Sequence, residues 1–423
     1  KRGLFNAFAG VQFSIGEDGQ FLTTINKQDF SPASRKGFAE FLRRKYGMVE
    51  KLRAAWHEPQ ADFYFPTPQS MPEFGDILRD LRNKDFLTSY DDAKYLDAIA
   101  WHNEMQLETL EYFAKRVREA AGRPMYVIAL TPSGFLKSWL DRVASGQTAI
   151  DACRDAYAYP DRRPGRPLGN AAAYDSMRAN KILCIDELDL RTWRIGKASD
   201  MHADFISQAK TPDEFRRILN RITGRMIARD MGYWYYDMNQ YFAGDKDIIR
   251  IIRQTNDIAR KVVEKSDTFT PSTALVIDHR SIIYNKFGHP TGDLCVRFNK
   301  WAAHSLSRAG VPYDMFYLDD FLKHPERAKK YSTVIFYAAL ELDSQNHAAI
   351  DDLKNSNRTI VWLYPSGLLS ASAGISEAEA SKLMGIGVRR DGNDSLMLVP
   401  TAGHDYEALM GISDLVNKLC YLG

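Results

Sequence analysis

Three carboxylates follow an apolar segment near the middle of the chain. Residues 182–185 read Ile-Leu-Cys-Ile, and Asp186, Glu187 and Asp189 come within the next four positions. In barrels of parallel strands, the catalytic groups sit at the C-terminal ends of the strands, where the loops surround one open mouth. We therefore interpret Glu187 as a catalytic carboxylate. The alternative is an ordinary exit from a strand into a loop, with acids that are only solvated.

A second apolar segment ends in a similar way. Residues 11–15 are followed by Gly16 and Glu17. Two carboxyl groups that face each other across a pocket are what cleavage of a glycosidic bond needs. One protonates the leaving oxygen, and the other attacks the sugar or activates water. The two strand ends, with Glu17 and Glu187, thus predict a glycosidase.

The composition sets broad limits on function. At 423 residues and 45% hydrophobic, the chain is long enough for two or more domains. A formal net charge of +2 creates no global field, so neither nucleic acid nor a membrane is expected as a partner. No apolar run reaches the roughly 20 residues that span a bilayer, and no signal-peptide pattern is present. The compartment is not determined, since the chain need not start at its natural beginning.

The cysteines give no sign of a metal centre or a disulfide framework. They are widely scattered and form no CxxC pair, and one of them lies inside an apolar strand segment, where it is typical of a small core residue. Neither structural zinc nor a set of disulfides is therefore expected.

Strand-like and helical segments alternate through residue 265, which is typical of βα units. Helix starts are marked by Ser31-Pro32 and by the capping box Thr211-Pro-Asp-Glu214. A closed (β/α)8 TIM barrel needs eight such units, and only five strands are expected here. Either the rest of the barrel lies outside this sequence, or the chain docks with another chain. The expected strands are residues 11–15, 125–130, 155–159, 182–185 and 232–237.

A polar stretch at 265–272 separates residues 1–265 from a second alternating pattern at 266–423. This second pattern predicts an open, doubly wound α/β sheet. Because no GxGxxG or GxxxxGKS/T sequence accompanies it, nucleotide binding is not expected. Strands are expected at 275–278, 313–318, 333–337 and 359–364, and helices at 298–308 and 347–354.

Residues 35–56 carry the pattern Phe-x-x-Phe-Leu-x-x-x-Tyr-Gly followed by Leu and Trp. Coming shortly after a strand that ends in Gly-Glu-Asp-Gly, this pattern resembles the region after the fourth barrel strand of glycoside hydrolase family 42 β-galactosidases. Residues 187–192 and 232–238 resemble the ends of the seventh and eighth strands. The domain from about residue 270 onward resembles the trimerisation domain of that family, which is akin to class I glutamine amidotransferases.

The resemblance implies a retaining glycosidase of clan A, with its acid/base after strand four and its nucleophile after strand seven. On this chain the acid/base position falls on Glu17 and the nucleophile position on Glu187. The clan usually has Asn where Gly16 stands here. A second registration places Gln20 in the acid position, which would leave the protein nearly inactive. The implied partners are an oligo- or polysaccharide substrate with β-linked sugars and further copies of the chain in a trimer, and this chemistry requires no metal or organic cofactor.

Other side chains near these strand ends are candidates for binding the sugar. Trp234 suits a platform on which the apolar face of a pyranose packs, or else it is a core aromatic. Arg191 either hydrogen-bonds a catalytic carboxylate or pairs with Asp189. Tyr159 ends the segment that resembles the sixth strand, where a solvated loop is the alternative. Gln20 joins this set if it lies beside the acid.

The rival hypothesis belongs to a different class. A carbohydrate-binding or assembly protein that kept the barrel but lost the acid would fit the registration on Gln20. The distance between the two carboxyl groups distinguishes the hypotheses, because a retaining pair stands roughly 5–5.5 Å apart. The sequence does not reveal which sugar is cleaved.

Overall fold

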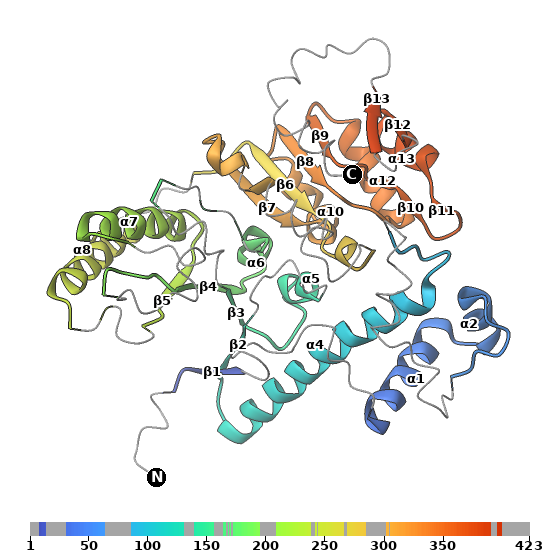
Figure 1. Cartoon of the computed structure of the whole chain (residues 1–423), viewed down its shortest axis with the longest axis horizontal. Helices are drawn as coiled ribbons and strands as arrows, with labels where there is room; N and C mark the ends of the chain where they lie inside the picture. Colours follow the sequence, from blue (N-terminus) through green and yellow to red (C-terminus); the bar gives the residue numbers. More distant parts are fainter. Residues whose placement is uncertain are drawn as a thin grey trace.

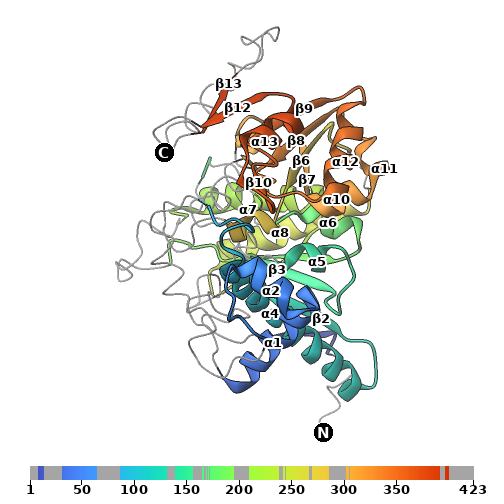
Figure 2. The ribbon, with the colours of Figure 1, turned by 90° about the vertical axis from the view of Figure 1, so that its right-hand side faces the viewer.

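The computed structural model places two parallel β-sheets with helices around them (Figure 1). It describes residues 8–13, 31–63, 86–130, 139–155, 164–165, 168, 170, 172–194, 209–237, 242, 244–265, 269–284, 302–303, 305–390 and 396–399. Figure 2 shows the second sheet and its helices at one end of the molecule and helix α1 (Pro32–Tyr46) towards the other.

The first sheet has five parallel strands in the order β1-β2-β3-β4-β5. All five overlap the expected segments, the third only at Asp155. The expected start of that strand was wrong, because β3 begins three residues earlier, and residues 156–159 lie outside the described residues. The sequence Ala-Cys-Arg-Asp has little intrinsic preference for a strand, and pairing with both neighbours places it in the sheet. The strands are β1 (Gly10–Phe13), β2 (Tyr126–Leu130), β3 (Ala152–Asp155), β4 (Leu183–Leu188) and β5 (Gly232–Tyr235).

The helices of this first domain begin where their caps predict. Ser31 Oγ accepts from the backbone N–H of Ser34 at 3.2 Å, ahead of α1. Thr211 Oγ1 accepts from the N–H of Glu214 at 3.2 Å, while the Glu214 carboxylate accepts from the N–H of Lys210. The other helices are α2 (Val49–Trp56), α4 (Ala93–Ala121), α5 (Leu140–Ala144), α6 (Tyr174–Ala179), α7 (Pro212–Ala228) and α8 (Lys246–Val263).

Helices α1 and α2 pack on the N-terminal half of α4 through a separate apolar cluster that includes Phe38 and Trp101. Beside it lies Asp97, a fully buried carboxylate on α4. Asp97 accepts hydrogen bonds from Lys45 Nζ at 2.5 Å, Tyr46 Oη at 2.7 Å and Trp56 Nε1 at 2.7 Å. A buried carboxylate needs such partners, so this cluster fixes how the three helices meet.

The second sheet has four parallel strands in the order β7-β6-β8-β9, with connections that run in opposite directions from β6. This order is that of a doubly wound sheet, and its parallel pairing fits the predicted α/β class. The strands are β6 (Thr273–Ile277), β7 (Tyr313–Tyr317), β8 (Thr333–Tyr337) and β9 (Thr359–Leu363). Around them lie η8 (Arg280–Tyr284), α10 (Leu318–Lys323), α11 (Pro325–Ala328), α12 (Ser344–Lys354), α13 (Glu377–Met384), and the short strands β10 (Leu369–Ser370), β11 (Gly374–Ile375), β12 (Gly387–Arg390) and β13 (Leu396–Val399).

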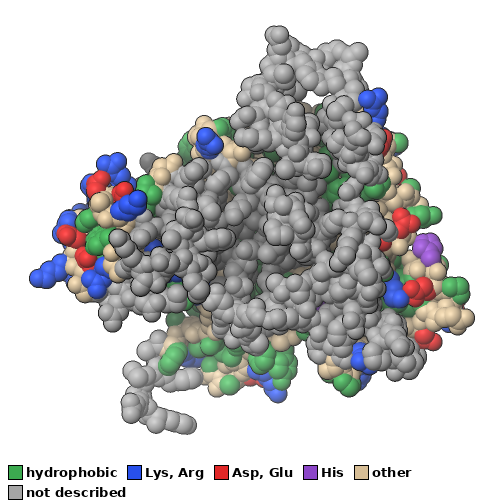
Figure 3. Space-filling model, viewed as in Figure 1, with side chains coloured by type: hydrophobic (Ala, Val, Ile, Leu, Met, Phe, Trp, Pro, Cys, Tyr) green, Lys and Arg blue, Asp and Glu red, His purple; other side chains and the backbone are tan. Residues whose placement is uncertain are grey.

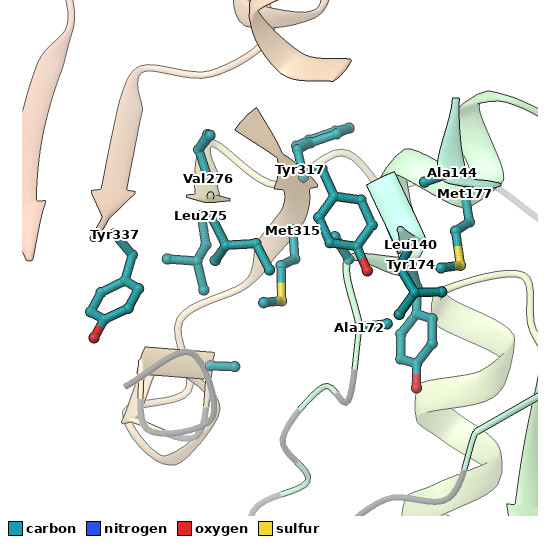
Figure 4. Packing of buried hydrophobic residues seen from close by; sticks show 14 of the residues in the cluster. Leu140, Ala144, Ala172, Tyr174, Met177, Leu275, Val276, Met315, Tyr317 and Tyr337 are labelled. Atoms are coloured by element: carbon teal, nitrogen blue, oxygen red, sulfur yellow. The ribbon is translucent and has the colours of Figure 1, made fainter. Parts of the chain in front are cut away.

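Helix α6 of the first domain covers the outer edge of β7. Asp175 Oδ2 accepts from the N–H of Met315 at 2.7 Å, and Ser176 Oγ accepts from the N–H of Tyr317 at 2.9 Å. Arg229 forms an ion pair with Asp175 and donates to the carbonyl oxygen of Tyr313 at 2.9 Å. One apolar core continues across this boundary, as the side chains in Figure 4 show. The two domains are thus joined by both apolar and polar contacts.

The surface over α7 and α8 is strongly charged. Figure 3 shows Lys, Arg, Asp and Glu side chains gathered there. Many of them form pairs within one helix, such as Arg217 with Asp213 and Arg250 with Asp247. Among the described helices, none combines the length and apolar character needed to cross a membrane.

Candidate active site

The side chains of β4 alternate between two faces of the first sheet. Cys184 Sγ lies 3.5 Å from Met177 Sδ on α6, and Asp186 forms an ion pair with Arg225 on α7. These two residues therefore face the helices. Because successive side chains on a strand point to opposite sides, Glu187 faces the other side of the sheet, where a barrel has its interior. Asp186 is thus a structural carboxylate and Glu187 is not.

Glu187 meets two side chains from the neighbouring strands. Arg154 Nη2 on β3 lies 2.7 Å from Glu187 Oε2. On the opposite side, Glu187 stands in register with Trp234 on β5. The Arg154 guanidinium carbon lies 4.8 Å from the centroid of the Trp234 ring, a cation–π contact. Three adjacent strands thus bring a carboxylate, a guanidinium and an indole together near their C-terminal ends.

The electrostatics of this group favour an anion. Arg154 and Glu187 are mostly buried, with 14% and 12% of their side chains exposed. A guanidinium at hydrogen-bond distance favours the ionised form of a carboxylate, and low exposure reduces the screening of their attraction by water. An ionised carboxylate is the form that acts as a nucleophile.

Trp234 lies on the same face as Glu187. Its neighbours Tyr233 and Tyr235 point the other way and place their hydroxyls 2.6 Å and 3.3 Å from Asn256 Oδ1 on α8. Tyr236 packs edge-to-face on Trp234 with 5.5 Å between ring centroids. The tyrosines at 233 and 235 are therefore core residues, whereas Trp234 is not part of the packing between sheet and helix.

Asp189 and Arg191 form a buried ion pair after β4. Their exposed fractions are 2% and 5%. Of the two roles expected for Arg191, the structure contains the pairing with Asp189. The backbone carbonyl of Arg191 also accepts from the N–H of Ala209 at 2.9 Å, which anchors the segment that leads to α7. The pair lies within a few residues of Glu187 and stiffens the loop that follows it.

Three of the sequence-predicted site residues, Glu17, Gln20 and Tyr159, lie outside the described residues. The separation between the two predicted catalytic carboxyl groups is therefore not defined by this structure. In the described part of the chain, no three His, Cys, Asp or Glu side chains converge as a metal site.

The sequence reasoning missed Arg154. The sequence feature that could have identified it is its position one residue after Cys153, which is buried and faces the core. Given the correct bounds of β3, alternation alone would have put Arg154 on the face of Glu187. The expected strand began one residue after Arg154 and so left this residue out.

The chain is similar to known proteins in its fold and not in its sequence. No protein-family model matches the chain, and no curated protein matches its sequence. Among solved structures, it is similar to a β-galactosidase from the psychrophilic Marinomonas ef1, with 13% identity, a TM-score of 0.54, and 86% of this chain and 57% of that chain covered. A cold-adapted β-galactosidase from Rahnella sp. R3 gives 14% identity, a TM-score of 0.58, and coverage of 86% and 54%. A catalytic mutant of a GH42 β-galactosidase from G. stearothermophilus is also similar. Its sequence identity is 12% and its TM-score 0.53, with 83% of this chain and 52% of that chain covered.

The chain spans little more than half the length of these solved chains. At such low identity the likeness concerns the fold alone, and it agrees with the resemblance found in the sequence. The first sheet, with its parallel strands and outer helices, corresponds to the wall of a TIM-type barrel. The chain therefore has a fold like that of the GH42 glycoside hydrolases.

Proposed function

We propose that this chain forms part of a retaining glycoside hydrolase that cleaves β-linked glycosides, with Glu187 as the nucleophile. The observation that carries the proposal is the group of Arg154, Glu187 and Trp234 on the inner face of the barrel-like sheet. Arg154 keeps the carboxylate charged and oriented, and Trp234 offers an apolar surface for the sugar ring. The β-galactosidase names of the similar solved structures suggest a β-galactoside as the first substrate to assay.

In the proposed reaction, Glu17 donates a proton to the glycosidic oxygen while a Glu187 oxygen attacks the anomeric carbon. The bond from the anomeric carbon to the leaving group breaks, and a covalent glycosyl-enzyme forms. Glu17, now a carboxylate, removes a proton from water, which displaces Glu187 and releases the sugar with its original configuration. Glu17 gives its proton to the leaving-group oxygen and takes one back from the attacking water, so the protons balance over the two steps.

The proposal concerns the protein in which the barrel wall is complete. The described strands form one part of such a wall, and the similar solved chains are longer than this one. The activity therefore has to be measured on the whole protein that contains this chain.

The test is covalent trapping. A 2-deoxy-2-fluoro-β-galactoside with a good leaving group forms a glycosyl-enzyme that hydrolyses slowly. Peptide mass spectrometry should find the label on Glu187. The Glu187→Ala variant should take no label and lose turnover of nitrophenyl β-galactoside, with partial recovery in azide. Glu119→Ala, an exposed glutamate on α4, is the matched control and should behave like the parent. A label on another carboxylate, or binding of the fluorosugar without any label, would refute the proposal.

We also propose that the protein self-associates as a trimer through residues 266–423. The motivation is the resemblance of this domain to a trimerisation domain, and no catalytic or nucleotide motif gives it another purpose. Contacts between one surface patch and a different patch on a neighbour give a closed ring when the rotation between copies closes. Light scattering of the intact protein should give three times the mass of one of its polypeptides, and a monomer at micromolar concentration would contradict this proposal.

A further inference from the structure

One hydrogen bond between side chains joins the loops that follow β4 and β5. Trp193, on the loop after β4, donates from its indole Nε1 to Asp245 Oδ2 at 3.2 Å. Asp245 stands at the end of the loop after β5, directly before α8. Because β4 and β5 are paired strands, this bond connects the two loops next to Glu187 and Trp234.

The two carboxylate oxygens of Asp245 bind different parts of the chain. Oδ1 accepts from the backbone N–H groups of Asp247 at 3.0 Å and Ile248 at 3.1 Å, which caps α8. Oδ2 accepts from the indole of Trp193. The cap needs one side-chain oxygen, which Asn also supplies, whereas the bond to Trp193 needs a second acceptor on the same side chain. The carboxylate thus ties the start of α8 to the loop after β4.

Aromatic packing orients Trp193 for this bond. Its ring meets that of Phe215 on α7 at 6.4 Å between centroids, with 88° between the ring planes. Phe215 packs on Phe242 at 5.9 Å, and Phe242 packs on Tyr235, the last residue of β5, at 5.8 Å. Helices α7 and α8 lie side by side over this group (Figure 1). A continuous set of rings therefore runs from the loop after β4 to the end of β5.

The short backbone segment between Glu187 and Trp193 carries this restraint to the strand end. The carbonyl oxygen of Leu188 accepts from the N–H of Tyr236 at 3.2 Å, which continues the pairing of β4 with β5. The buried ion pair after β4 lies within the same segment. A shift of the loop at Trp193 would therefore change how Glu187 stands relative to Trp234.

We propose that Trp193 and Asp245 are positioning residues for the reaction at Glu187. Their hydrogen bond keeps the Glu187 carboxylate at the distance and angle from which it attacks the anomeric carbon. This inference rests on the proposed function. Reacting atoms must stand about 3–3.5 Å apart, and a misplacement of about 1 Å can cost about a hundredfold in rate. Loss of the bond therefore slows the chemical step more than it weakens substrate binding.

A double-mutant cycle on the whole protein that contains this chain tests the inference. Trp193→Phe keeps a ring against Phe215 and removes the donor. Asp245→Asn keeps the cap of α8 and turns an NH2 group towards Trp193. Each variant should lower kcat for nitrophenyl β-galactoside about tenfold, with KM changed by less than about twofold. The double variant should be no slower than the single variants, since all three lack the same bond.

Trp139→Phe is the matched control. Trp139 Nε1 donates to Gln106 Oε1 at 3.1 Å, so this change also removes one indole hydrogen bond, but between α4 and the start of α5. It should keep the kcat and KM of the parent. Thermal unfolding of each variant separates lost activity from lost folding. Three results would overturn the inference: parental kcat in both single variants, a raised KM at constant kcat, or effects that multiply in the double variant.

Hydrogen exchange separates this inference from the proposed function, because it needs no turnover. The amide of Tyr236, which donates to Leu188, should exchange at least about threefold faster in Trp193→Phe and in Asp245→Asn than in the parent. Unchanged exchange in both variants would overturn the inference whether or not the protein is active. If exchange rises but the parent turns over no β-glycoside, the bond restrains the loops and the proposed function is what fails.

Discussion

His279 follows β6 at the point where the strand order of the second sheet reverses. Only 2% of this residue is exposed. Neither ring nitrogen finds a hydrogen-bond partner among the described residues, and the ring packs edge-to-face on Tyr317 at 5.1 Å between centroids. Burial disfavours the charged imidazolium, and it lowers the pKa of His279 from 6.5 to about 3. The folded protein therefore holds this histidine neutral at pH values where an unfolded chain protonates it.

This difference in proton binding destabilises the folded state in acid. Above pH 6.5 both states are neutral at this residue, so His279 has no pH-dependent effect. Between pH 6.5 and about pH 3 only the unfolded chain takes up the proton, and the free energy of unfolding falls by about 1.4 kcal/mol for each pH unit. At pH 5 the loss from this one residue is about 2 kcal/mol. That is a large part of the stability of an ordinary domain.

The perturbation that isolates this effect is His279→Leu, which removes the titrating group and keeps an apolar side chain against Tyr317. Urea unfolding of the parent and the variant at pH 7.5 and pH 5 gives the four free energies needed. The parent should lose about 2 kcal/mol more than the variant between these pH values. His57→Asn, at an exposed helix end where Asn tolerates the left-handed backbone, should lose as much as the parent. Equal losses in the parent and in His279→Leu would refute the reasoning.

Three further variants probe the contacts described above. Arg154→Met removes the cation beside Glu187, so kcat should fall about tenfold or more and the acid limb of the kcat/KM profile should move to higher pH, with a smaller change in KM. Asp175→Asn leaves the buried Arg229 without its counter-charge and should lower the free energy of unfolding by about 3–5 kcal/mol in urea. Gly37→Ala would place a methyl group 2.5 Å from an indole ring of α4 and should destabilise by about 1–3 kcal/mol.

Two of these variants, Asp175→Asn and Gly37→Ala, have a control on α7. Asp213→Ala removes an exposed aspartate and should change stability by less than about 0.5 kcal/mol. Gly224→Ala adds a methyl group into open space and should stabilise the helix by about 0.5–1 kcal/mol. A stabilised Gly37→Ala would show that the contact between α1 and α4 is looser than the structure has it. Unchanged pH dependence in Arg154→Met would remove Arg154 from the proposed mechanism.

Local signals in the sequence were sufficient for most of the fold. The cap at Thr211 and the apolar run of β8 (Thr333–Tyr337) depend on residues within one turn or one strand, and both were predicted correctly. The alternation of such segments also predicted the parallel strands of the second sheet. Where a segment lacked local preference, as in β3, the predicted start was wrong, because pairing with β2 and β4 rather than residue type makes it a strand.

The candidate site was less accessible to sequence reasoning. The face of Glu187 follows from alternation along β4, but its contact with Arg154 depends on the register between two strands, which no local pattern encodes. Arg191 had two possible partners at similar spacing, and its pairing with Asp189 depends on the course of the loop after β4. Contacts between residues far apart in the chain cannot be predicted from local sequence patterns, because they depend on how the strands and loops are arranged in the fold.

The cover that α6 places on β7 has a consequence for the second domain when it stands alone. An uncovered edge strand is a template for pairing with another chain and leads to aggregation. If residues 269–399 were expressed without the first domain, the N–H groups of Met315 and Tyr317 would lose Asp175 and Ser176 as acceptors. The first domain therefore protects the edge strand of the second from pairing with other chains. A fragment cut at the linker should precipitate or form oligomers of several sizes, even though its four strands β6–β9 still pair with one another.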